Sequence, residues 1–97
     1  MHPVVFTQAA REELIKAQDW YEEEVSGLGR RFRKEVDVLV QRIGQNPQQF
    51  PVALKNVRRA LLRRFPYSLF FAIEEDRAVL VIACFHASRD PARWQKP

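Results

Sequence analysis

The stretch Ala78-Val79-Leu80-Val81-Ile82-Ala83-Cys84-Phe85 contains eight consecutive residues without a charge, a glycine or a proline. It is too short to cross a bilayer. It is rich in β-branched side chains and follows the acidic turn Glu74-Glu75-Asp76. Such a run predicts a strand that is apolar on both faces, so we expect it in the middle of a sheet with cover on each side.

Polar residues follow this strand directly, so its end is the first place to look for a function. The segment His86-Ala87-Ser88-Arg89-Asp90-Pro91-Ala92-Arg93-Trp94 brings an imidazole, two guanidinium groups and a carboxylate to that end. His86 has two readings of equal weight: a functional group, or a structural one bonded to Asp90 or to a backbone carbonyl. For Arg89 and Trp94 we favour structural roles, in a local pair with Asp90 and as a cap on the core.

Length and composition predict one domain that spans residues 1–97, because 97 residues with 46% apolar content suffice for a single core. Met1 to Phe6 lack the basic segment and apolar run of a secretory signal, which favours a cytoplasmic protein without a membrane segment.

Cys84 lies inside the apolar strand and is expected to be a buried hydrophobe. The two histidines, His2 and His86, stand far apart, so we expect neither a metal site nor a cofactor.

Charge is distributed unevenly along the chain. Residues 1–29 carry a net charge of −4, residues 30–64 carry +8, and the remainder is balanced. A basic middle third indicates a polyanion or an acidic protein as partner. The alternative is a solvated surface that the acidic first helix partly neutralises. The ten cations of this basic block are Arg30, Arg31, Arg33, Lys34, Arg42, Lys55, Arg58, Arg59, Arg63 and Arg64.

The first half of the chain predicts a short strand and a helical hairpin. Val4-Val5-Phe6 reads as the strand, with Thr7 as the N-cap of the first helix. Ser26-Gly27-Leu28-Gly29 permits the reversal between the two helices, and Gly44-Gln45-Asn46-Pro47 ends the second. Each helix carries apolar residues at spacings of four, three and four, which form one stripe. These residues are Ala10, Leu14, Ala17 and Tyr21, with Tyr21 preferred to Trp20 for the core, and Phe32, Val36, Leu39 and Ile43.

The second half predicts a loop and three strands. Residues 48–56 read as a loop that Phe50 anchors, and the strands are expected at 57–65, 67–74 and 77–86. Short connections require these strands to form an antiparallel meander. The fold class is therefore α+β, with an N-terminal strand and a two-helix antiparallel hairpin packed on a mainly antiparallel sheet.

The strand predicted at 57–65 has cations on both faces. Arg59 and Arg63 alternate with Arg58 and Arg64. Because an unpaired guanidinium is costly to bury, whichever face lies away from the helices presents two arginines to solvent, where they suit phosphate or carboxylate. The other reading is an edge strand that charge protects from aggregation, and both can hold together.

This order of elements is similar to that of a known family. The chain resembles the RelE/ParE superfamily of toxins from bacterial type II toxin-antitoxin modules, and within it the ParE-like branch. The resemblance implies the fold described above. It also implies a cognate antitoxin with an acidic, partly disordered segment, and operator DNA would be bound only through this antitoxin. The segments that carry it are Ala10 to Tyr21, Gly27-Leu28-Gly29, Asn46-Pro47, Arg58-Arg59-Ala60-Leu61-Leu62-Arg63-Arg64-Phe65-Pro66-Tyr67 and His86 to Trp94.

The resemblance implies one of two activities. ParE-like members poison DNA gyrase, whereas RelE-like members cut mRNA on the ribosome without a metal. The nuclease pattern typically has an arginine after the tyrosine that opens the middle strand and a tyrosine near the C-terminus. Here those places hold Ser68 and, nearest the second, Trp94. Some nucleases of the superfamily use a late histidine, so His86 and Arg89 are the catalytic candidates if the chain is an enzyme.

We therefore expect a toxin, with gyrase as the first choice of target and mRNA as the second. A non-toxic accessory domain that binds nucleic acid is the third reading. The residues expected to bind the target or the antitoxin are Arg58, Arg59, Arg63, Arg64 and Trp94.

Overall fold

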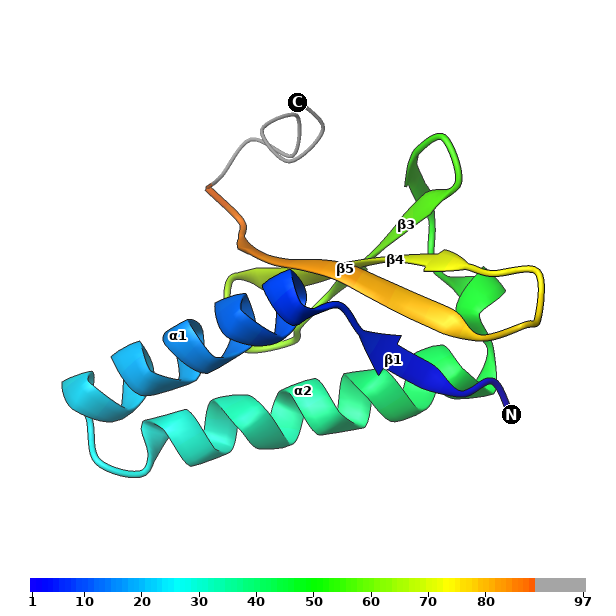
Figure 1. Ribbon diagram of the computed structural model, residues 1–97. Coiled ribbons are helices and arrows are strands. Elements are labelled where there is room, and N and C mark those ends of the chain that lie inside the picture. Colours follow the sequence, from blue (N-terminus) through cyan, green and yellow to red (C-terminus); the bar gives the residue numbers. More distant parts are fainter. Residues whose placement is uncertain (89–97) are drawn as a thin grey trace.

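The computed structural model describes residues 1–88, in which one strand and two helices precede four further strands (Figure 1). The sheet order is β1-β5-β4-β3-β2. β1 pairs with β5 in parallel, and the other three pairings are antiparallel. The predicted α+β class and mainly antiparallel sheet are thereby confirmed. The elements are β1 (Val4–Phe6), α1 (Gln8–Glu24), α2 (Leu28–Gln45), the 3-10 helix η1 (Pro47–Gln49), β2 (Val52–Leu54), β3 (Val57–Leu61), β4 (Tyr67–Ile73) and β5 (Val79–His86).

The apolar run forms β5, which lies between β1 and β4 as expected. Both helices pack on one face of the sheet (Figure 1). Val79, Val81 and Cys84 belong to the core on this face. On the other face, Ile82 and Phe85 are only partly buried. No helix within residues 1–88 lies on this face, but Ala83 is buried there in a small second cluster with Phe70 and Val57, so the predicted cover on both sides of the strand is only partial.

The helices follow the predicted spacing. The four expected residues of α1 and the four of α2 are all buried. Thr7 Oγ1 accepts a hydrogen bond from the Ala10 N–H at 3.1 Å, so Thr7 caps α1. Within residues 1–88, no helix is long and apolar enough to cross a membrane.

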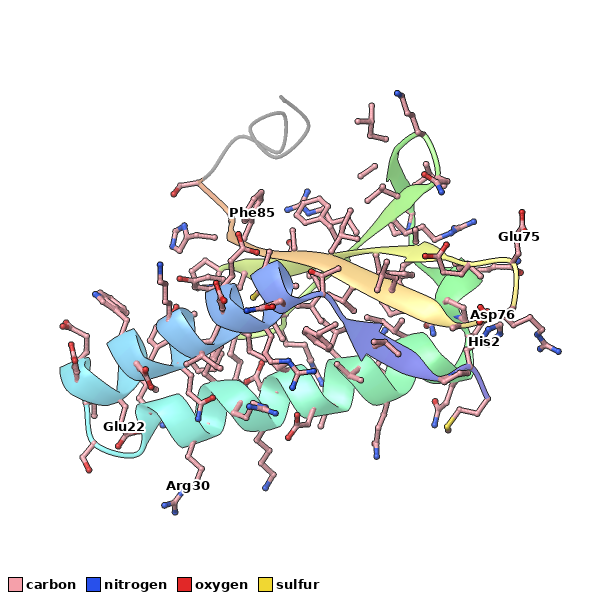
Figure 2. The ribbon with its side chains drawn as sticks, in the orientation of Figure 1. His2, Glu22, Arg30, Glu75, Asp76 and Phe85 are labelled. Atoms are coloured by element: carbon pink, nitrogen blue, oxygen red, sulfur yellow. The ribbon has the colours of Figure 1, made fainter. Side chains whose placement is uncertain are left out.

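The link between the helices depends on two glycines and one carboxylate. Gly27 has φ +88°, a conformation that favours glycine, and a Cβ on Gly29 would lie 2.6 Å from the Gln18 carbonyl oxygen. Glu22, at the end of α1 (Figure 2), accepts hydrogen bonds from the N–H groups of Gly27 at 2.8 Å and Gly29 at 2.9 Å. The Gly27 bond is the main reason that the pKa of the Glu22 carboxyl is lowered. This carboxylate therefore joins the two helices through the otherwise unpaired donors at the start of α2.

Aromatic rings join the hairpin to the sheet. The Tyr21 ring lies 5.2 Å from Phe32 and 4.9 Å from Phe65, and the Phe32 and Tyr67 rings are 5.3 Å apart. Burial raises the pKa of the Tyr21 hydroxyl. Trp20 is 54% exposed, as its position on the helix predicted.

The sheet differs from the prediction at β2 and β3. A three-residue strand, β2, lies within the segment predicted to be a loop, although Phe50 is buried there as expected. β3 ends at Leu61 rather than Phe65. The chain turns after Leu61 so that Leu62 and Phe65 both reach the core, which strict alternation along one strand would not allow.

Candidate functional site

A groove lies between α2 and the chain at the end of β3. Its volume is about 810 Å³, and its lining residues come from α2 and from positions 61–64. Val38 and Leu61 are 52% and 54% exposed, and with Leu39 and Leu62 they supply its apolar surface. We call this feature the α2–β3 groove.

The α2–β3 groove is strongly cationic. Glu35 is the one anion in its lining, against five cations: Arg31, Lys34, Arg42, Arg63 and Arg64. Arg42 lies over the Phe50 ring, 5.3 Å from the ring centre. No ion pair within residues 1–88 involves Arg31, Lys34 or Arg63. An apolar surface rimmed by unneutralised cations suits a ligand that is both apolar and acidic.

Glu35 holds the two walls of the groove together. Its Oε1 accepts a hydrogen bond from the Arg64 N–H at 3.1 Å, and its Oε2 lies 3.9 Å from Arg64 Nε. The Arg64 side chain is nevertheless 77% exposed. Arg64 is thus tied through its backbone, while its guanidinium remains open to solvent.

Arg58 does not join this groove. Its Nη1 donates hydrogen bonds to the carbonyl oxygens of Phe50 at 2.6 Å and Gln48 at 3.3 Å. Arg58 is therefore committed to the loop that follows η1. Sequence alternation could not show this, because it does not tell which carbonyls a loop presents, and the binding role of Arg58 stays a prediction.

Arg59 lies on the sheet face opposite the helices. It pairs across the sheet with Phe70, and its Nε donates a hydrogen bond to Ser68 Oγ at 3.0 Å. Ser68 is buried and Arg59 is exposed. Phe85, directly opposite Ser68, also points away from the helices (Figure 2).

His86 lies on the helix-facing side of the sheet. It pairs with Tyr67, and the two rings are 5.2 Å apart. Its Nδ1 lies 2.8 Å from Ser88 Oγ and accepts the Ser88 N–H at 3.1 Å. These contacts agree with a structural role, although the partner is Ser88 rather than a carbonyl. His86 and Arg59 therefore occupy opposite faces of the sheet, on strands that β4 separates.

Two candidates from the sequence, Arg89 and Trp94, lie outside the described residues, as does Asp90. Of the remaining five, Arg63 and Arg64 line the groove, and Arg58, Arg59 and His86 do not. Four residues of the groove were not predicted from the sequence as site residues: Arg31, Lys34, Val38 and Arg42. The three cations belong to the basic block at residues 30–64. Their positions in the sequence place them next to the buried apolar stripe of α2, and this signal could have identified them.

Comparisons with known proteins agree with this architecture. Residues 4–91 match the family described as the ParE toxin of the type II toxin-antitoxin system, parDE. No curated protein sequence matches the chain.

Three solved structures share the fold. A chain of the chromosomal ParDE toxin-antitoxin system from P. aeruginosa is 20% identical with a TM-score of 0.72, covering 91% of this chain and 98% of its own. The isolated E. coli RelE toxin is 16% identical with a TM-score of 0.68, covering 98% and 94%. A chain of the RelBE2 toxin-antitoxin complex from Mycobacterium tuberculosis is 19% identical with a TM-score of 0.62, covering 88% and 96%.

The match to the family model covers nearly the whole chain and agrees with the β-α-α-β order and the antiparallel strands that follow. The chain therefore belongs to the ParE toxin family of type II toxin-antitoxin systems.

Proposed function

We propose that this toxin acts by poisoning DNA gyrase and is held inactive by an acidic antitoxin segment in the α2–β3 groove. The observation that carries the choice of target is the separation of His86 from Arg59. Cleavage of RNA by a protein needs a base, an acid and a cation that converge on one phosphate. Within residues 1–88, the candidate acid-base group and the sheet arginine lie on opposite faces, which does not favour a nuclease.

The environment of His86 supports the same choice. Its ring packs against Tyr67, and its Nδ1 is engaged by Ser88. Ser68, at the place where the nuclease pattern has arginine, is buried and bonded to Arg59.

The antitoxin is proposed from the family and from the charge of the groove. Five cations and one anion surround an apolar surface, so a segment with alternating acidic and apolar groups would satisfy both. Such a segment folds as it binds, and any contact with operator DNA would be made by the antitoxin.

The test is to induce the chain in bacteria and to measure DNA breaks and mRNA cleavage separately. We expect growth arrest with gyrase-linked breaks, and we expect His86→Ala to retain toxicity as fully as the matched variant His2→Ala. Cleaved mRNA, with activity lowered about 10²-fold by His86→Ala alone, would instead establish a nuclease. Growth without inhibition would favour the non-toxic accessory domain.

A further inference from the structure

The face of the sheet that lies away from the helices is mostly apolar. An antiparallel sheet with one covered face normally presents polar side chains on the other. Here the cross-strand pairs place only one charged residue and one hydroxyl among apolar neighbours, and no helix within residues 1–88 lies over them (Figure 1). We call this surface the free sheet face. Its residues are Val5, Val57, Arg59, Ser68, Phe70, Ala72, Leu80, Ala83 and Phe85.

A β-bulge adds a further apolar side chain to this face. The register between β4 and β5 shifts between Phe70 and Phe71, so that Ile82 and Ala83 both lie on the side away from the helices. Ile82 and Phe85 are only partly buried there, and Val5 is 52% exposed. The face therefore offers continuous apolar surface to a partner.

Arg59 is the one cation of the free sheet face, and its side chain is held in place. Its Nε donates a hydrogen bond at 3.0 Å to the hydroxyl of Ser68, which is 2% exposed. No ion pair within residues 1–88 involves Arg59. Both terminal NH2 groups of its guanidinium thus remain for an anion, and the bond to Ser68 orders the side chain before binding.

The charge at the end of the face favours a protein over a nucleic acid. The β4–β5 turn carries Glu74, Glu75 and Asp76, the last two labelled in Figure 2. With Val5 and Leu80 of the face they line a hollow of about 570 Å³ that no cation lines. A phosphate backbone would meet three carboxylates there and apolar side chains elsewhere, whereas a protein surface can match both.

The area of the face argues against a second copy of this chain. Four strands about 4.8 Å apart, with three rows of side chains about 7 Å apart, cover on the order of 300 Å². A stable dimer buries about 800 Å² on each partner. The free sheet face is therefore suited to one protruding segment, as the centre of a larger contact.

We propose that the free sheet face binds the protein target of the toxin, with Arg59 holding a target carboxylate that apolar side chains flank. The identity of the target as gyrase rests on the proposed function. None of the residues that define this face lines the α2–β3 groove. Target and antitoxin therefore have separate surfaces on the toxin.

The test measures binding of the full chain to purified DNA gyrase by surface plasmon resonance, with two matched pairs of variants. Arg59→Gln is expected to weaken binding at least about tenfold, because it removes a charged hydrogen bond, and Arg11→Gln makes the same charge change on α1. Val5→Asp places a carboxylate on the apolar face and is also expected to cost about tenfold. Val52→Asp is its control, because Val52 is 53% exposed and lies on β2. Both controls are expected to bind within about twofold of the wild type.

Ser68 is tested as a positioning residue. Ser68→Ala removes the acceptor that orders Arg59, and it is expected to weaken gyrase binding about three- to tenfold. In the Arg59→Gln background the same change is expected to have less than about a twofold effect, since Ser68 acts through Arg59. A merely structural role would weaken both backgrounds equally.

Growth arrest after induction of each variant separates failure of the face from failure of the gyrase assignment. Equal gyrase binding by the wild type, Arg59→Gln and Val5→Asp would overturn the face as the target surface. A wild-type chain that does not bind gyrase, with growth arrest lost in these two variants alone, would overturn gyrase and support the face.

Three other results would overturn the proposal. A chain that binds no gyrase would do so if the face variants retain growth arrest, or if the wild type causes none. A twelve-nucleotide RNA that the wild type binds and Arg59→Gln does not, in a chain that leaves gyrase unbound, would replace the protein partner by nucleic acid. Circular dichroism identifies a misfolded variant, and if Val5→Asp fails to fold, the comparison of Arg59→Gln with Arg11→Gln decides.

Discussion

The carboxylate of Glu35 accepts the backbone N–H of Arg64 at 3.1 Å and so connects α2 to the turn after β3. This bond spans the α2–β3 groove at its one anionic residue. It keeps the backbone of the turn in place while the Arg64 guanidinium stays exposed. The pair therefore fixes one wall of the groove in place, while four further cations, Arg31, Lys34, Arg42 and Arg63, contribute to its charge.

Removal of the Glu35 carboxylate is expected to destabilise the fold. Glu35→Ala leaves the Arg64 N–H without its acceptor, and we expect the free energy of unfolding to fall by about 1 kcal/mol. Asp37→Ala is the control on the same helix, because Asp37 forms a solvent-exposed pair with Arg33 and is expected to change stability by less than about 0.5 kcal/mol. Urea denaturation measures both, and equal values would argue against a bridging role for Glu35.

Neighbouring arginines of β3 are expected to behave differently. Arg58→Gln removes the charged donor to the Phe50 and Gln48 carbonyls, which is expected to cost about 1–2 kcal/mol of stability. Arg59→Gln removes a partly solvated bond to Ser68 and is expected to cost less. Chemical denaturation followed by circular dichroism distinguishes the two, and a larger loss for Arg59→Gln would contradict this assignment.

Acid is expected to weaken the helical hairpin through Glu22. Its pKa is lowered in the folded state, so its contribution to stability is present above the ordinary carboxyl pKa of about 4.3 and is lost as pH falls through the lower folded value. Glu22→Gln is expected to reduce stability at pH 7 and to flatten its dependence on pH below about 4.3. Glu23→Gln, one residue along α1, is the control. The check is the unfolding midpoint measured from pH 7 to pH 2, and the same slope in both variants would exclude Glu22 as a source of acid sensitivity.

Association with the partner is expected to depend on the unpaired cations of the groove. Replacing Lys34 and Arg63 by Gln is expected to lower the on-rate roughly tenfold at low salt, because charge complementarity steers encounter. Replacing Arg11 and Lys16 of α1 changes the net charge equally outside the groove and is expected to have less effect. Stopped-flow association with the polypeptide encoded beside this gene measures the rates. An on-rate that does not change with salt, or no such partner, would count against the proposed site.

The sequence alone determined the helices and the central strand. The stripe from Ala10 to Tyr21 and the stripe from Phe32 to Ile43 are buried as their spacing predicted, since helical periodicity is a local property. The apolar run from Ala78 to Phe85 likewise predicted a strand between two others. The basic block at residues 30–64 indicated an acidic or polyanionic partner, and the family resemblance predicted the toxin class.

Only the tertiary structure decided which cations remain available for binding. Arg58 and Arg59 are adjacent in sequence, yet one is bonded to loop carbonyls and the other lies on the opposite face of the sheet. Arg31 of α2 and Arg63 of the turn line one groove although 32 positions separate them. Alternation along a strand gives the direction of a side chain but not its partner, because partners come from segments that the fold brings close. The end of β3 at Leu61 follows from the same long-range packing of Leu62 and Phe65 into the core.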